Sequence, residues 1–335
     1  MLVGVCLAGA ATYWAIFGPA LWKARATPTP LTVQLNWRHQ FQFAGCYAAK
    51  EQGFYDAAGV QVVFKEWTGG LDAVDEVLAG RADVGIGAAN ILEARLAGKP
   101  VVALATIFQR SPLALLALKG SGIATPQDVA GKRLAITLHS DLELWAMLRK
   151  AGVRVQDVIL ADNVTTRVGD LLEGRVDAIS GYLSTQVPQL QARGLDPVVL
   201  RPAIYDIEFY GDTLFTDEAT LKRRRQELDA FVSATLKGWE YALAHPDAVV
   251  DSILQHYAPE ADRAALLREA EAVQRLVAPD LAPIGSMQPV RWQAMAGELL
   301  ALGYAGNLER VEGMLHISES ERLQALRRSL GLALA

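Results

Sequence analysis

The segment from Asn36 to Phe43 brings together residue types that could bind a small, flat, polar molecule. It reads Asn-Trp-Arg-His-Gln-Phe-Gln-Phe. An aromatic ring can stack on a planar ligand, which contributes about 0.5–1.5 kcal/mol beyond the area buried, and a carboxamide both donates and accepts hydrogen bonds. We therefore expect Trp37 to be a stacking face, and Asn36 and Gln42 to be hydrogen-bonding groups. Burial of Trp37 in the core and capping of the loop by the two amides are the structural alternatives.

Further candidate residues lie near the ends of predicted strands and in two segments that link the halves of the chain. Ligands of open α/β sheets bind beyond the carboxyl ends of the strands, so aromatic and polar side chains there are candidates for the same site. Each has a structural alternative: a helix cap for Asn90, core packing for Phe41, and a hinge ion pair for the carboxylates of 208–212. These additional candidates are Phe41, Trp67, Asn90, Gln109, Ser140, Tyr182, Tyr210 and Asp212.

The sequence shows no arrangement typical of a catalytic or metal centre. Its five histidines, at positions 39, 139, 245, 256 and 316, do not follow a metal-ligand spacing. Nucleophile-elbow and P-loop motifs are absent from the sequence, and the stretch Gly85–Asn90 lacks the third glycine of a dinucleotide-binding fingerprint. We expect no catalytic residue, no metal and no cofactor.

Composition places the chain among globular proteins. It has 335 residues, of which 51% are hydrophobic, and a formal net charge of −5. This length suggests about two domains. The acidic balance argues against nucleic acid as a partner.

The N-terminal segment has features of an export signal. Residues 2–22 carry no charge, and Ala24-Arg25-Ala26 fits a cleavage site. A positively charged start is missing, and about 20 apolar residues could also span a bilayer as an uncleaved anchor; a misplaced start codon is a third alternative. We expect residues 1–26 to be a signal peptide or a membrane anchor. The folded part would then lie in the periplasm or on the extracytoplasmic face.

Short β-rich runs alternate with helical runs from residue 31 onward. The sequence predicts strands at 31–37, 60–67, 83–87 and 101–108, and again at 133–137, 158–161, 177–181 and 197–200. Single helices between consecutive strands of each group predict βαβ units and mainly parallel sheets. After about residue 215 the chain is almost wholly helical, with predicted helices at 218–244, 248–256, 261–276, 289–302 and 318–330.

A repeated motif indicates two similar lobes. Leu78-Ala-Gly-Arg-Ala-Asp83 recurs as Leu172-Glu-Gly-Arg-Val-Asp177, each where a helix ends before a buried strand. We predict a discontinuous first lobe at 31–112 and 210–306, a second lobe at 113–209, and a C-terminal helical tail at 307–335. The stretches 109–121 and 201–212 would cross between the lobes, and two such hinge strands suit a cleft that opens and closes.

Several segments, taken in their order and spacing, resemble one known family. They are Leu35-Asn-Trp37, Tyr47-Ala-Ala-Lys-Glu-Gln-Gly-Phe-Tyr55, Gly80-Arg-Ala-Asp83, Lys119-Gly-Ser-Gly-Ile123, Thr125-Pro-Gln-Asp128 and Gly238-Trp-Glu-Tyr-Ala-Leu-Ala-His-Pro246. The chain thereby resembles the thiamine-pyrimidine binding and synthesis family. This family belongs among the periplasmic solute-binding proteins that also serve sulfonate, nitrate and taurine importers.

The resemblance implies a type II periplasmic-binding-protein fold and a binding function. The chain would hold a pyrimidine thiamine precursor, or a similar small heterocycle, between its lobes and deliver it as a monomer to an ABC permease in the membrane. Phe43 stands where many relatives have a histidine. One ligand contact of the family is therefore expected to be missing.

Two other functions remain open. The chain could be the ligand-sensing domain of a signalling system, which an uncleaved anchor would favour. It could also be a pyrimidine synthase of the same family, in which the resemblance places a cofactor-binding lysine at Gly87, a consumed histidine at Asn90 or Ile91, and a cysteine-rich stretch at about 207–215. Lysine, histidine and cysteine are missing at these positions, so we expect a binding protein and no enzyme.

Overall fold

The computed structural model describes residues 29–137, 141–161 and 167–317. The chain divides into two units, residues 1–30 and residues 31–335. The predicted signal peptide or anchor at 1–26 and the predicted helix at 318–330 lie outside the described residues. Among the residues that are described, no helix combines the length and the apolar character needed to cross a membrane.

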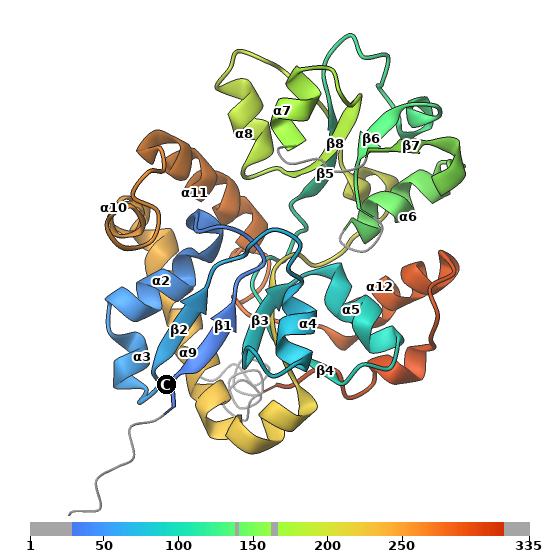
Figure 1. Ribbon diagram of the computed structural model, residues 1–335. Coiled ribbons are helices and arrows are strands. Elements are labelled where there is room, and N and C mark those ends of the chain that lie inside the picture. Colours follow the sequence, from blue (N-terminus) through green and yellow to red (C-terminus); the bar gives the residue numbers. More distant parts are fainter. Residues whose placement is uncertain (1–28, 138–140, 162–166, 318–335) are drawn as a thin grey trace, which may run out of the picture. The chain divides into compact units, whose positions relative to one another are not determined.

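Within the described chain, five strands form a first sheet in the order β2-β1-β3-β10-β4 (Figure 1). β1 pairs with β2 and β3 in parallel, whereas β10 is antiparallel to both β3 and β4. The sheet is therefore mixed: four strands run in the same direction as predicted, and β10, which returns from beyond residue 200, runs the other way. The strands are β1 (Leu31–Gln34), β2 (Val62–Lys65), β3 (Val84–Gly87), β4 (Val101–Thr106) and β10 (Thr213–Asp217).

The described part of residues 113–200 supplies a second sheet, in the order β7-β6-β8-β5-β9. β6 is parallel to β7 and β8, and β5 is antiparallel to β8 and β9. In both sheets the antiparallel strand is the first one after the chain has crossed from the other sheet. The strands are β5 (Leu113–Ala117), β6 (Arg133–Ala135), β7 (Ile159–Leu160), β8 (Ala178–Tyr182) and β9 (Val198–Leu200).

Helices flank both sheets (Figure 1). Those joined to the first sheet are α2 (Ala44–Glu51), α3 (Phe54–Ala57), α4 (Ala73–Leu78), α5 (Ala89–Leu96), α9 (Glu218–Ala244), α10 (Pro246–His256), α11 (Arg263–Val277) and α12 (Pro289–Ala301). Those joined to the second are α6 (Leu142–Lys150), α7 (Arg167–Leu172) and α8 (Gln186–Gln191). Two sheets, flanking helices and two crossings confirm the predicted fold class, whereas the exact lobe boundaries stay a prediction.

The repeated motif forms the same hydrogen bonds in both sheets. Asp83 accepts from the Thr32 N–H over 3.0 Å, and Asp177 accepts from the Arg133 N–H over 2.8 Å. In both copies the arginine of the motif also pairs with an acid of the preceding helix, Glu76 or Asp170. The motif therefore joins the turn before β3 to β1 in the first sheet, and the turn before β8 to β6 in the second.

The sequence prediction missed β5. We expected residues 109–121 to be a linking stretch, but Leu113–Ala117 is a fully buried strand between β8 and β9. Its sequence, Leu-Ala-Leu-Leu-Ala, is apolar throughout because both faces are covered, so it lacks the alternation that marks a half-buried strand. β1 is also shorter than predicted, since it ends at Gln34 and leaves Asn36 and Trp37 in the following loop.

The two crossings are joined to each other by the main chain of Asp212. Its carbonyl oxygen accepts from the N–H groups of Ile107 and Phe108 over 2.8 and 3.1 Å, and the Gly211 N–H donates to the Phe108 carbonyl over 2.9 Å. A Cβ atom on Gly211 would lie 2.9 Å from both Phe108 Cβ and Pro112 Cδ. Glycine therefore lets the two crossings approach this closely.

Two glycines let α2 pack directly on α9. A Cβ atom at Gly238 would lie 2.0 Å from the carbonyl oxygen of Gly45, and one at Gly45 would lie 2.2 Å from the Trp239 ring. α2 continues from the loop that carries Asn36 and Gln42. The contact therefore holds this loop against the body of the first sheet's helices.

We expect Gly238→Ala to destabilise the protein by at least about 1–3 kcal/mol, because a methyl group cannot enter this helix contact without moving backbone. The matched control is Gly297→Ala, since Gly297 also lies inside a helix but has open space where Cβ would be. The control should stabilise the protein by up to about 1 kcal/mol. Urea unfolding followed by circular dichroism measures both, and equal effects of the two substitutions would contradict the packing account.

Candidate functional site

Three polar side chains from distant parts of the chain meet beyond the carboxyl end of β1. The Asn36 Nδ2 group donates to Asp212 Oδ1 over 3.3 Å, and Gln42 Nε2 donates to Asp212 Oδ2 over 2.6 Å and to Asn36 Oδ1 over 3.2 Å. We call Asn36, Gln42 and Asp212 the polar triad. All three are candidate ligand residues predicted from the sequence.

The carboxylate of the polar triad determines which way the Asn36 amide faces. The ionised form of Asp212, which predominates above a pH of about 7, only accepts hydrogen bonds, so the Asn36 NH₂ group then faces Asp212 and its oxygen faces Gln42. Gln42 and Asp212 are each 2% exposed, whereas Asn36 is half-buried. The inner side of the Asn36 amide is thus fixed, and one N–H and one lone pair are left for a ligand.

Burial raises the pKa of Asp212 from 3.8 to about 7, although the hydrogen bonds from Gln42 and Asn36 oppose this change. Burial also raises the pKa of Tyr182 well above its usual value, and the charges of Asp212, Glu143 and Asp141 raise it further. Tyr182 ends β8 in the second sheet. Tyr182 therefore stays a candidate ligand residue of the second sheet.

Trp37 and Trp67 form a stacked pair next to the polar triad. Their ring centroids are 4.8 Å apart with an interplanar angle of 25°. The Trp67 indole N–H donates to the Leu71 carbonyl over 2.9 Å, which fixes that ring, and Trp37 is 36% exposed. With Trp67 against it on one side, the exposed part of Trp37 is the open aromatic surface of this pair.

Four other predicted residues have structural contacts. Phe41 is fully buried in the core, and the amide of buried Gln109 donates to the carbonyls of Thr106 and Ser286. Buried Tyr210 accepts from a main-chain N–H through its hydroxyl and is covered by a guanidinium 4.0 Å from its ring. Asn90 caps the Ala88 N–H in the first turn of α5.

The structure joins Asn36, Gln42 and Asp212 by hydrogen bonds and stacks Trp37 on Trp67. That these residues and Tyr182 bind a ligand stays a prediction. Ser140 lies outside the described residues.

Two buried acids near this site were not predicted. Glu269 of α11 accepts hydrogen bonds from the main-chain N–H groups of Phe41 and Gln42. Glu143 of α6 is 2% exposed, and one of its oxygens has no hydrogen-bond partner within the described structure. Both lie on amphipathic helices, where an acid in the sequence resembles an ordinary solvent-facing residue.

The sequence was compared with models of known families. The family model described as "NMT1/THI5 like" matches residues 40–249, which is more than half of the chain. The chain belongs to the NMT1/THI5-like family. This confirms the resemblance that the sequence motifs indicated.

Curated relatives of this NMT1/THI5-like chain include binding proteins and a synthase. The riboflavin-binding protein RibY of Chloroflexus aurantiacus is 28% identical over 82% of this chain and 80% of its own length. The formylaminopyrimidine-binding protein of Halalkalibacterium halodurans is 27% identical over 66% and 69%. The 4-amino-5-hydroxymethyl-2-methylpyrimidine phosphate synthase of Legionella pneumophila is 28% identical over 67% and 73%.

Solved structures with the same fold include periplasmic binding proteins. The alkanesulfonate-binding protein SsuA from Xanthomonas axonopodis pv. citri superposes with a TM-score of 0.68 at 15% identity, covering 88% of this chain and all of that one. At this identity the match concerns the fold alone. It agrees with the two-lobed architecture predicted for the NMT1/THI5-like chain.

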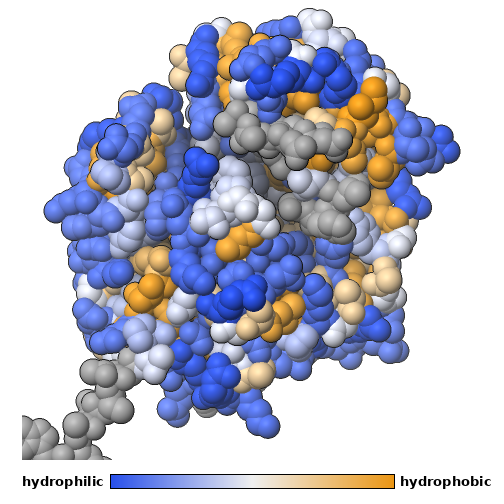
Figure 2. All heavy atoms as spheres, in the orientation of Figure 1, coloured by the Kyte–Doolittle hydropathy of each residue, from blue (hydrophilic) through white to orange (hydrophobic). Residues whose placement is uncertain are grey.

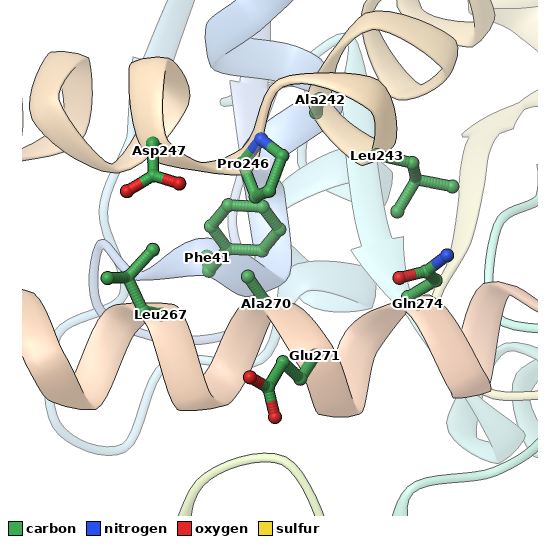
Figure 3. A pocket seen from close by; sticks show the side chains of 9 residues that line it. All are labelled: Phe41, Ala242, Leu243, Pro246, Asp247, Leu267, Ala270, Glu271 and Gln274. Carbon is green, nitrogen blue, oxygen red and sulfur yellow. The ribbon is translucent and has the colours of Figure 1, made fainter.

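A separate cavity of about 230 Å³ lies between α9, α10 and α11 (Figure 3). The Phe41 ring forms part of its lining beneath Pro246, with Leu267 and Ala270 on the α11 side and the carboxylates of Asp247 and Glu271 at its edges. Phe41, which lines this cavity, directly precedes Gln42 of the polar triad in the chain. None of the cavity's other lining residues was predicted from the sequence.

The face shown in Figure 2 is mostly hydrophilic, with hydrophobic side chains in separate groups. Separate hydrophobic groups of this kind are ordinary on the surface of a folded protein. The expectation that the NMT1/THI5-like chain is a monomer stays a prediction.

We expect Asp212→Asn to change the pH dependence of stability. Because the pKa of Asp212 rises from 3.8 to about 7 on folding, the folded chain favours the protonated acid. The stability that this proton contributes is complete below the unfolded pKa and is lost as the pH rises through 7. Asparagine cannot ionise, so the variant should gain stability relative to the parent as the pH rises from 4.5 to 8.

Thermal unfolding across this pH range measures the effect. Each unit of pKa shift corresponds to about 1.4 kcal/mol, so a difference in Tm of several degrees is expected at pH 8. Asp196→Asn, at a largely exposed acid of the second lobe, is the control and should leave the pH profile unchanged. A difference between Asp212→Asn and the parent that does not vary with pH would contradict the burial of an ionisable Asp212.

Proposed function

We propose that this chain is an extracytoplasmic solute-binding protein of an ABC importer that holds a small, flat heterocycle between its two lobes. A pyrimidine precursor of thiamine is the first candidate ligand. The proposal extends to a permease as partner and to a mechanism of binding and hinge closure without chemistry. Family membership and the fold support this class of function.

The observation that carries the proposal is the fixed amide of Asn36 beside the exposed Trp37 ring. Asp212 and Gln42 occupy the edge of that amide on which its oxygen and one N–H point in the same direction. The remaining lone pair and N–H diverge, so the amide can accept one hydrogen bond and donate one to separate ligand groups. An aminopyrimidine has an exocyclic amino group that donates and ring nitrogens that accept, and its ring could stack on Trp37.

Acidic groups around the site favour a ligand that donates hydrogen bonds. Asp212 and Glu143 are both buried, and the charges of both raise the pKa of Tyr182. An anion would interact unfavourably with the ionised forms of these acids, which predominate above a pH of about 7 for Asp212 and about 8 for Glu143. We therefore expect an uncharged or cationic heterocycle to bind in preference to a sulfonate or a phosphate ester.

The residues at the synthase positions support binding over catalysis. A Cβ atom at Gly87 would lie 3.0 Å from both Asn90 Oδ1 and Ile91 Cγ1, so a cofactor-binding lysine could not replace this glycine without rearrangement. The consumed histidine corresponds to Asn90 or Ile91, of which Asn90 makes a capping hydrogen bond and Ile91 is fully buried. These observations leave the chain without the residues that the synthase reaction would use.

Riboflavin is a second candidate ligand, because a curated relative that matches four-fifths of its own length is named a riboflavin-binding protein. The imide edge of a flavin also alternates donors and acceptors, and the stacked indoles of Trp37 and Trp67 offer an aromatic surface. A ligand panel can separate the two candidates.

We expect 4-amino-5-hydroxymethyl-2-methylpyrimidine or its formylamino analogue to raise the Tm of the protein. A ligand at 100 times its Kd stabilises the folded state by about 2.7 kcal/mol. Thermal-shift measurements with these two pyrimidines, riboflavin and an alkylsulfonate test this. A shift with riboflavin alone would make the flavin the ligand, and a shift with the alkylsulfonate alone would overturn the proposed ligand class.

We expect Trp37→Ala to weaken binding of the active ligand by about tenfold, which corresponds to 1.4 kcal/mol and to the loss of a stacking face. Calorimetric titration measures the affinity, and the unfolding transition should stay cooperative. Ile204→Ala, at an exposed apolar residue of the second lobe, is the control and should bind as tightly as the parent. Unchanged affinity in Trp37→Ala would remove this residue from the site.

A further inference from the structure

Glu269 is a buried acid of α11 whose carboxyl group accepts hydrogen bonds from the main chain of Phe41 and Gln42. It is 4% exposed. Its Oε2 atom accepts from the Phe41 N–H over 3.2 Å, and its Oε1 atom accepts from the Gln42 N–H over 3.1 Å. Phe41 and Gln42 begin the helical turn Phe41–Phe43, which leads into α2. N–H groups at such a start have no partner within the helix.

We propose that Glu269 is the positioning residue of the ligand site. Its two hydrogen bonds fix the main chain of Phe41 and Gln42. The Gln42 carboxamide is thereby directed to Asp212 and Asn36, and this contact determines the orientation of the Asn36 amide that faces the ligand. This inference rests on the proposed function in one respect, because it assigns that amide to ligand recognition. The positioning of Gln42 itself does not depend on any ligand.

The packing of the Phe41 side chain also holds this turn. The ring is fully buried in the core of the first sheet's helices, next to the cavity of about 230 Å³ that Ala242, Leu267 and Ala270 also line (Figure 3). The turn is therefore held both by the packed ring of Phe41 and by the two main-chain hydrogen bonds to Glu269.

α11 gives Glu269 a fixed position relative to the hinge. At the other end of the same helix the Leu276 carbonyl accepts from the Arg110 N–H over 3.1 Å. Arg110 lies in the first crossing between the sheets, two residues after Phe108, which is bonded to Asp212. One helix therefore holds both the turn that carries Gln42 and the crossing that lies against Asp212.

A carboxylate suits this role better than an amide. Two main-chain N–H groups donate to Glu269, one to each oxygen of its carboxyl group, whereas glutamine has one oxygen and a donor group. Burial raises the pKa of Glu269 to about 8, against the effect of the two N–H groups. Replacing Glu269 by glutamine therefore keeps its shape and removes one of its two acceptors.

The first test follows Gln42 without a ligand. In nitrogen-15 NMR spectra of the whole protein, Glu269→Gln should shift the Gln42 side-chain amide signals and speed exchange of the Phe41 and Gln42 amide protons by at least tenfold. Glu271→Gln is the matched control, because Glu271 is an exposed acid on the same helix. Unchanged Gln42 signals in Glu269→Gln would overturn the positioning role.

The second test measures binding of 4-amino-5-hydroxymethyl-2-methylpyrimidine in a double-mutant cycle. Glu269→Gln and Gln42→Ala should each weaken binding about tenfold, and Glu269→Gln should add less than twofold once Gln42 is alanine, because the acid acts through this residue. Independent, additive losses would show a general structural role and contradict the proposal.

The two tests separate failure of the inference from failure of the proposed function. If the parent protein does not bind the pyrimidine, the result counts against the proposed ligand. The NMR comparison then decides the role of Glu269 alone. A shifted Gln42 signal supports the positioning role in either case.

Discussion

The site depends on one buried carboxylate that belongs to both the hinge and the binding wall. The main-chain oxygen of Asp212 joins the two crossings through Ile107 and Phe108, and its side chain accepts from Asn36 and Gln42. In the proposed mechanism, a movement of the crossings would therefore be transmitted to the Asn36 amide. Asp212 would belong to both the hinge and the recognition group, and closure of the lobes would be linked to the orientation of Asn36.

Keeping this acid buried lowers stability at neutral pH, since burial raises the pKa of Asp212 to about 7. An asparagine at position 212 would avoid that loss of stability. Its amide could turn either way, however, and the orientation of the Asn36 amide would no longer be determined. Functional sites often retain such unfavourable groups. Glu269 is a second buried acid of this kind: burial raises its pKa, and its carboxyl group accepts from the main-chain N–H of Gln42.

Much of the fold could be predicted from the sequence, because glycine-ended helices and short apolar strands alternate regularly. Strand β5 could not, since its fully buried sequence has no alternation. In the site, Trp37 and the polar triad were predicted from residue type and strand ends. Residue type could not separate these residues from Gln109 and Tyr210, whose polar groups make structural hydrogen bonds in the interior. Glu269 could not be predicted, because its hydrogen bond to Gln42 joins residues 227 positions apart in the chain.

The central claim is that the Asn36 amide, held on its inner side by Asp212 and Gln42, binds the ligand with its outer side. The side-chain NH₂ of Asn36 has two protons that nitrogen-15 NMR resolves separately. On titration with the pyrimidine that stabilises the protein, the proton facing away from Asp212 should shift strongly, and the proton bonded to Asp212 should stay nearly unchanged. A ligand that binds without moving either proton signal would contradict the claim.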